Sequence, residues 1–106
     1  MADSLDEVVR MLPSDTFYVV LETYGLRFLH EAEIPLENHI AIVVGAEDYG
    51  IPEEAVAVIP EQSRVVARIP GAVQGMSYNV ASTVAMAVYE VERRLAAGRE
   101  ARGGSP

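Results

Sequence analysis

Three polar side chains in two glycine-containing loops are the best candidates for chemistry in this sequence. Glu47 lies between Gly45 and Gly50, and Ser77 and Asn79 follow a second loop of small residues. Glycine lets the backbone approach a ligand closely, and a carboxylate, a hydroxyl and an amide beside it can position a polar substrate group. The residues alone also permit a simpler interpretation, in which Glu47 is a solvated carboxylate in a turn and the other two are helix caps.

Several other chemistries lack the residues that they need. The chain has no cysteine, which excludes thiolate nucleophiles, disulfides and thiolate metal sites. Neither loop has the spacing of a P-loop or a dinucleotide fingerprint. A serine nucleophile would need a base, but His39 opens an apolar strand and is expected to be structural, and His30 is expected to be exposed. The acidic residues lack metal-ligand spacing, so we expect no metal.

The composition describes an acidic protein with a modest core. The net charge is −8, and all eight basic residues are arginine. Such a chain binds nucleic acid poorly without specificity, although one face can still be locally basic. No apolar run approaches the roughly 20 residues of a membrane span, and the acidic N-terminus does not resemble a secretory signal. We therefore expect a cytoplasmic protein.

The two loops follow apolar segments that read as buried strands. Strands are expected at 16–22, 39–45 and 64–69, which are mainly apolar and rich in β-branched residues. The segment 39–45 has the pattern of a central parallel strand. Helices are expected at 4–12, briefly after Pro52, and at 79–97. This alternation predicts a three-layer α/β domain with a mainly parallel sheet, whose ligands bind at the carboxyl ends of the strands.

Remaining segments complete the predicted domain organisation. Residues 1–98 are expected to form one domain, with Gly98 ending the last helix and 99–106 forming a disordered tail. Residues 26–29 are expected to be briefly extended or helical. Tyr78 and Tyr89 on the last helix are expected to pack rather than to stack on nucleobases.

Two segments resemble the motifs of a known family. Residues 42–52, which read IVVGAEDYGIP, resemble the second motif of the SpoU (TrmH-like) RNA ribose 2′-O-methyltransferases of the SPOUT superfamily. Ile69-Pro70, followed by the sequence SYNVA at 77–81 and VYE at 88–90, resembles the third motif. Residues 18–23 resemble the strand and turn that precede these motifs. The resemblance covers about residues 16–94.

The resemblance implies a fold, a cofactor and a set of site residues. The fold would be a Rossmann-like sheet with a C-terminal trefoil knot, and the protein a homodimer through its last helix. It would methylate tRNA or rRNA with S-adenosylmethionine. The implied catalytic residues are Glu47, Ser77 and Asn79. The implied cofactor-binding residues are Leu21, Gly45, Ala46, Ile69, Gly71, Met76, Ser77 and Val80.

The sequence departs from the family pattern in two places. The small residues of the 71–76 loop are shifted relative to many members. The first motif, which carries an asparagine and the catalytic arginine, would precede residue 1, so the domain looks shortened at its N-terminus by a strand-helix-strand unit. Arg10 lies in a short helix without an asparagine partner. Three hypotheses therefore remain: an active methyltransferase or its cofactor-binding part, a knotted dimer that binds S-adenosylmethionine or a partner without transfer, and a generic α/β binding domain.

Overall fold

A four-stranded parallel sheet forms the centre of the computed structural model, which describes residues 5–45, 50–70 and 80–103. The strands are β1 (Thr16–Leu21), β2 (Arg27–Phe28), β3 (His39–Val44) and β4 (Arg64–Arg68). Their order in the sheet is β2-β4-β1-β3, and every pairing is parallel. The α/β class and the parallel sheet predicted from the sequence are confirmed.

Strand β1 is the most deeply buried element because it has a neighbour on each edge and a layer on each face. All six of its residues are buried. Phe17, Val19 and Leu21 point into one apolar cluster, and Tyr18 and Val20 into another on the opposite face. This alternation follows from the two-residue repeat of a strand. An uninterrupted apolar sequence is therefore the pattern of a strand covered on both sides.

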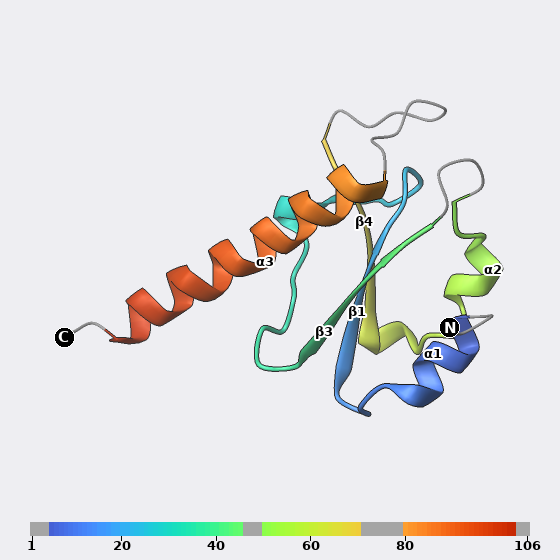
Figure 1. Ribbon diagram of the computed structural model, residues 1–106, viewed down its shortest axis with the longest axis horizontal. Coiled ribbons are helices and arrows are strands. Elements are labelled where there is room, and N and C mark those ends of the chain that lie inside the picture. The colour runs from blue at the N-terminus through green and yellow to red at the C-terminus, as the bar shows by residue number, and fades with distance from the viewer. Residues whose placement is uncertain (1–4, 46–49, 71–79, 104–106) are drawn as a thin grey trace.

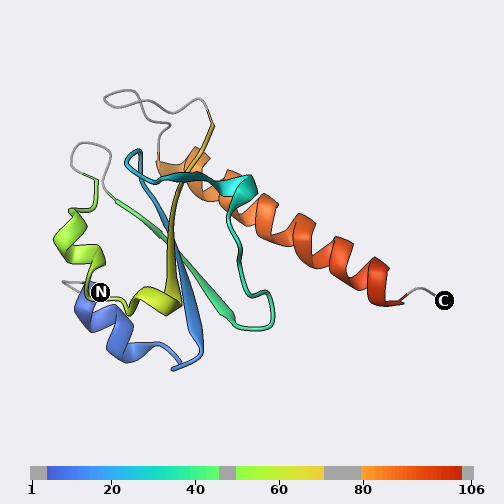
Figure 2. The same cartoon turned by 180° about the vertical axis from the view of Figure 1, so that it is seen from behind.

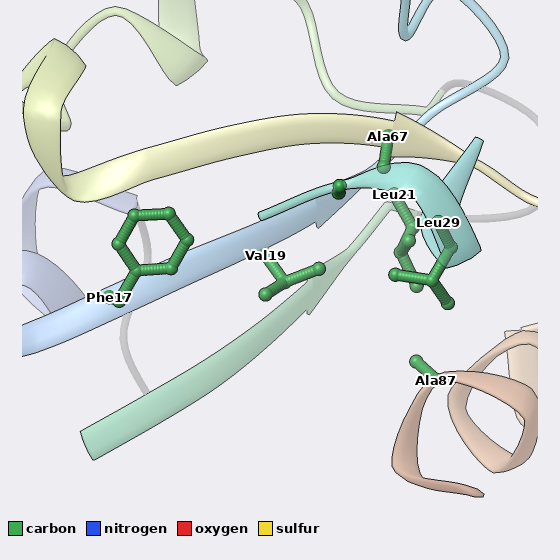
Figure 3. Close-up of a cluster of buried hydrophobic side chains, with 7 residues drawn as sticks. Phe17, Val19, Leu21, Leu29, Ala67 and Ala87 are labelled. Atoms are coloured by element: carbon green, nitrogen blue, oxygen red, sulfur yellow. The ribbon is translucent and has the colours of Figure 1, made fainter. Parts of the chain in front are cut away.

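Helices cover both faces of the sheet and give the three layers that were expected. On one face lie α1 (Leu5–Met11) and α2 (Glu53–Val56), where Leu5, Val9 and Val56 pack against β1. On the other face lie α3 (Val80–Gly103) and the 3₁₀ helix η1 (Leu29–Glu31). Figure 3 shows Leu29 and the small Ala87 of α3 facing Val19 and Leu21 of β1.

The position of β3 corrects one expectation. We expected the segment 39–45 to be a central strand, but β3 pairs only with β1 and forms an edge of the described sheet. Residues 40–44 are only half-buried, and His39 is exposed. The apolar pattern indicates that both faces of a strand are covered by other layers. It does not indicate whether a further strand pairs with the strand's edge.

The last helix is longer than predicted. It continues through Gly98 to Gly103, so the predicted stop at Gly98 is wrong, and residues 99–103, which we assigned to the tail, are helical. One glycine costs a helix only about 1 kcal/mol relative to alanine. The Ala-Ala before Gly98 and the Arg-Glu-Ala-Arg after it are strong helix formers, which outweigh that cost. The C-terminal half of α3 extends away from the sheet (Figure 1).

Other expectations can be compared with the structure segment by segment. We expected residues 26–29 to be extended or helical, and they contain both: Arg27–Phe28 form β2, and Leu29 begins η1. His30 is exposed as expected. Tyr89 is 69% exposed, so its predicted role in packing is wrong for the single chain. The trefoil knot depends on the path of residues 71–79, which lie outside the described residues, and it stays a prediction.

Candidate functional site at the carboxyl ends of the strands

Three neighbouring strands end side by side at the carboxyl end of the sheet. In the strand register, Leu21 at the end of β1 pairs with Val44 of β3 and with Ala67 of β4. Gly45 follows β3 directly, and Ile69 follows the last residue of β4. Parallel sheets bind ligands at this end, because loops from adjacent strands converge there. Leu21, Gly45 and Ile69, which we predicted to bind the cofactor, are therefore brought together.

The loop after β3 is closed at its base by two glycines. A Cβ atom on Gly45 would lie 2.5 Å from the carbonyl carbon of Gly50, so only glycine allows these two backbones to touch. Gly50 adopts φ 67°, the left-handed region that favours glycine. The sequence predicted close backbone approach at Gly45. The structure shows that what approaches it is the far end of its own loop.

Two side chains from the turn after β1 hold the same loop. The Glu22 carboxylate accepts a hydrogen bond from the backbone N–H of Ile51. The Tyr24 hydroxyl donates to the carbonyl oxygen of Ile51 at 2.5 Å. Both backbone groups of one residue are thus fixed by side chains 29 and 27 positions earlier in the chain. Burial and the neighbouring Glu22 carboxylate raise the pKa of Tyr24, so its hydroxyl keeps the proton that it donates.

The turn after β1 is also joined to β4. The backbone N–H of Glu22 donates to the carbonyl oxygen of Ala67 at 3.0 Å. A Cβ on Gly25 would lie 2.7 Å from the Ala67 carbonyl carbon, which requires glycine there. The turn residues Glu22 and Gly25 therefore connect the loop after β3 with the end of β4. The carboxyl ends of β1, β3 and β4 and the turn residues Glu22 and Gly25 thus form one continuous surface, which we call the rim.

Helix α3 is fixed to η1 by a charged cluster. The Arg94 guanidinium donates to the carbonyl oxygens of Leu29 and Ala32 at 2.7 and 2.6 Å, and to Glu90 at 2.7 Å. Glu90 also accepts two hydrogen bonds from Arg93, at 3.1 and 2.7 Å. The hydrogen bonds from Arg93 and then Arg94 lower the pKa of Glu90 to about 2, although burial opposes them. This cluster holds the helix that begins at Val80.

Not every predicted site residue can be placed. Val80 is the first residue of α3 and is half-buried. The other predicted positions lie outside the described residues: Ala46, Glu47, Gly71, Met76, Ser77 and Asn79. The roles given to them stay predictions. Among residues 5–45, 50–70 and 80–103, no group of three His, Asp or Glu side chains could hold a metal ion, and no helix is long and apolar enough to cross a membrane.

Sequence reasoning missed the residues that build the rim. Glu22 was assigned only to the end of a strand, Tyr24 only to the turn after it, and Glu90 only to a family motif. A carboxylate directly after a fully buried strand is one usable signal for Glu22, because it must lie at the carboxyl edge. No sequence pattern connects Arg94 with carbonyl groups 62 and 65 positions earlier.

The fold and the rim together define a class of protein, an α/β protein whose candidate ligand site is built from loops at the carboxyl edge of a parallel sheet. The family model described as the SpoU rRNA Methylase family matches residues 1–89. The chain belongs to this family. No curated protein matches the chain.

Solved structures agree with this assignment. One, described as "Structural insights into the 2-OH methylation of C/U34 on tRNA", is 27% identical with a TM-score of 0.72, over 90% of this chain and 58% of that chain. Another, a putative RNA methyltransferase from Bacillus anthracis, is 24% identical with a TM-score of 0.67, over 86% of this chain and 55% of that chain. The chain thus spans a little over half the length of each.

Proposed function

We propose that this protein is an S-adenosylmethionine-dependent RNA ribose 2′-O-methyltransferase of the SpoU type, or the cofactor-binding part of one. The observation that carries the proposal is the rim at the ends of β1, β3 and β4, in a chain that belongs to this family. The structural neighbour associated with 2-OH methylation of tRNA supports tRNA as the substrate class. As part of the same proposal, the protein acts on RNA in the cytoplasm.

The described residues fit a cofactor with an apolar, planar end. Leu21 is buried, and Val44 and Ile69 pack against the same apolar cluster, which gives the rim an apolar floor. Gly45 places bare backbone beside that floor. Backbone amides at strand ends can read the edge of a nucleobase, while the floor contacts its face. We assign Leu21, Gly45, Ile69 and Val80 to cofactor binding, with Ala46, Gly71, Met76 and Ser77 as further contacts.

The protein's contribution to the reaction is mainly positioning. When bound, S-adenosylmethionine supplies a methyl group on a sulfonium. A 2′-hydroxyl must be held in line with that group and must lose its proton. By resemblance to the family, we assign these tasks to Glu47, Ser77 and Asn79. Glu22 and Tyr24 would act indirectly, by fixing the base of the loop that carries Glu47.

Calorimetric titration with S-adenosylmethionine tests the cofactor site. Gly45→Ala should weaken binding at least tenfold, because the new Cβ would collide with the Gly50 backbone. Gly98→Ala is a matched control, since a Cβ there meets nothing within 4 Å. Its affinity should equal that of the wild type. Absence of binding heat in the wild type at millimolar ligand would refute the proposal, as would equal affinities in both variants.

A second candidate function is cofactor or partner binding without methyl transfer. The position of Arg10 favours it, because this arginine is in the last turn of α1, the helix that directly precedes the amino end of β1 and not the carboxyl ends that form the rim. Its guanidinium is exposed and pairs with Asp6 at 3.1 Å. Transfer of a tritiated methyl group to bulk tRNA or rRNA separates the two functions. Transfer by this chain alone would exclude the second one.

We also propose that the protein forms a homodimer through α3. The exposed side of this helix carries Val88 and Tyr89, which are 45% and 69% exposed. Ala81, Ala85 and Ala96 are exposed on the same helix and leave room for close approach. Large apolar side chains exposed on a helix are typical of an interface. Light scattering coupled to size-exclusion chromatography tests this proposal directly.

A further inference from the structure

Two arginines in this acidic chain have guanidinium groups that pair with no carboxylate among residues 5–45, 50–70 and 80–98. Among the arginines whose side chains the structure describes, Arg10, Arg93 and Arg94 pair with carboxylates, and Arg64 donates to a backbone carbonyl. Arg27 and Arg68 have no such hydrogen bond within the described part of the chain, and the Nε atom of Arg68 is buried without an acceptor. In a chain of net charge −8, uncompensated cations are a notable exception.

These two arginines lie one position apart on the paired strands β2 and β4, Arg68 on the same face as Phe28 and Arg27 on the other, so that they flank the edge strand β2 from both sides. Strand β2 pairs with β4 so that Arg27 is opposite Ala67, and Phe28 is opposite Arg68. The pairing is at the carboxyl end of β4, directly before Ile69, so the two arginines adjoin the rim. Figure 2 shows η1, which follows β2 directly, beside α3 at this end of the sheet.

Planar groups at the same place lie against one another. The Arg68 guanidinium carbon is 4.6 Å from the centre of the Phe28 ring. The His30 ring lies 5.5 Å from Phe28, centre to centre, with only 14° between the planes. Stacking therefore fixes the Arg68 guanidinium, whereas Arg10, Arg64, Arg93 and Arg94 are fixed by hydrogen-bond acceptors. Within the described residues, no acidic group accepts from the Arg68 donors.

The accessible part of this cluster consists of Arg27 and His30, with Phe28 half-buried between strand and helix. The carboxylate of Glu31 accepts a hydrogen bond from the backbone N–H of Phe28 at 3.3 Å. That carboxylate therefore closes the turn from β2 into η1. It does not pair with either arginine.

We propose that Arg27, Phe28, His30 and Arg68 form a docking strip for single-stranded RNA beside the methyl-transfer site. This proposal rests on the proposed function. Single-stranded RNA is held by phosphate contacts with arginine and by stacking of its unpaired bases on aromatic rings and guanidinium planes. The strip supplies both kinds of group next to the rim. An acidic peptide would use the arginines but would gain little from the stacked rings, so RNA is the better match.

Fluorescence anisotropy with a short labelled oligoribonucleotide tests the strip at low salt. Arg27→Gln should weaken binding severalfold and reduce the slope of log affinity against log salt by about 0.7, the value for one phosphate contact on a single strand. Phe28→Leu keeps an apolar side chain and should weaken binding about fivefold or more, because a stacked ring is lost. His30→Ala, at an exposed position, should also weaken binding.

Arg10→Gln is the matched control, because it removes one exposed positive charge at the far end of the sheet. It should leave RNA affinity and the salt slope unchanged. Equal losses in Arg10→Gln and Arg27→Gln would overturn the proposal, as would absence of RNA binding by the wild type. Loss in Arg27→Gln without any loss in Phe28→Leu and His30→Ala would show a simple charge contact, and displacement of RNA only by acidic peptides would show a protein site. Both results contradict the strip.

Calorimetry with S-adenosylmethionine on the same variants separates this proposal from the proposed function. Cofactor affinity should be unchanged in Arg27→Gln and His30→Ala, and a thermal melt of Phe28→Leu shows that it is folded. If the wild type binds the cofactor but substitutions in the strip leave RNA affinity unchanged, the docking strip is refuted and the proposed function stands. If RNA binding depends on the strip but the cofactor does not bind, the function is refuted and the strip stands.

Discussion

The charged cluster of Glu90, Arg93 and Arg94 should determine how firmly α3 is held on the sheet. Replacing Arg94 by methionine keeps an unbranched apolar stem but removes every hydrogen bond that the side chain donates. The carbonyl oxygen of Ala32 loses the Arg94 donor, that of Leu29 keeps only the backbone N–H of Ala32, and Glu90 keeps a charge in a site where its side chain is only 13% exposed. We expect a large loss of stability, because the partners of the removed group remain buried.

The magnitude can be worked from Glu90. A pKa lowered from 4.5 to about 2 corresponds to roughly 3 kcal/mol. Residual exposure of Glu90 reduces this, so we expect Glu90→Gln to cost about 2 kcal/mol. Arg94→Met should cost about 3 kcal/mol, since it also removes the charged hydrogen bonds to the carbonyl oxygens of Leu29 and Ala32. Arg93→Gln is the matched control. It also removes bonds to Glu90, but Arg93 is half exposed, so water replaces it and the loss should be clearly smaller.

Urea unfolding followed by circular dichroism measures these changes, and the double variant gives the coupling between Glu90 and Arg94. The same cluster predicts acid sensitivity. Because folding depresses the pKa of Glu90, its contribution is complete above about pH 4.5 and is lost as the pH falls through about 2. Glu90→Gln should remove that part of the acid dependence. Equal losses in Arg94→Met and Arg93→Gln, or an unchanged acid profile in Glu90→Gln, would refute this account of the cluster.

Three further predictions concern the rim and the dimer. Gly50→Ala should cost about 1–2 kcal/mol in urea unfolding, because its Cβ would lie 2.7 Å from Glu22 at φ 67°; an unchanged midpoint would contradict the tight loop base. Glu22→Ala should weaken S-adenosylmethionine binding about tenfold in calorimetry, since Ile51 loses its acceptor, and unaltered affinity would exclude a positioning role. Tyr89→Glu should give monomers by light scattering; a dimer that persists would move the interface off this face of α3.

Much of the sheet was predictable because its strands are short apolar runs. The expected segments 16–22, 39–45 and 64–69 match β1, β3 and β4 within one residue at each end. The edge position of β3 could not be read in this way, since an apolar residue on either face looks the same with or without a paired neighbour. The stop at Gly98 failed for a related reason, because a single unfavourable residue was weighed without its helix-forming neighbours.

The location of the site was more predictable than its construction. Because parallel sheets bind ligands at their carboxyl ends, the strand pattern was enough to predict that the loops at Gly45 and Ile69 lie at the ligand-binding end of the sheet, whereas Leu21 was implied only by the family resemblance. The contacts that shape the rim join distant positions, such as Glu22 with Ile51 and Arg94 with Leu29. Such pairs arise from the three-dimensional path of the chain. Local sequence patterns therefore do not predict these contacts.

The most direct test of the central claim is an NMR titration of the isotopically labelled protein with S-adenosylhomocysteine. The account predicts progressive shifts of the backbone amides of Leu21, Gly45, Ile51 and Ile69 at the carboxyl edge of the sheet. The amides of Thr16 and His39 at the amino ends of β1 and β3 should not move. Shifts centred on α1 or on the amino ends, or no shifts at millimolar ligand, would contradict the assignment of this rim as the cofactor site.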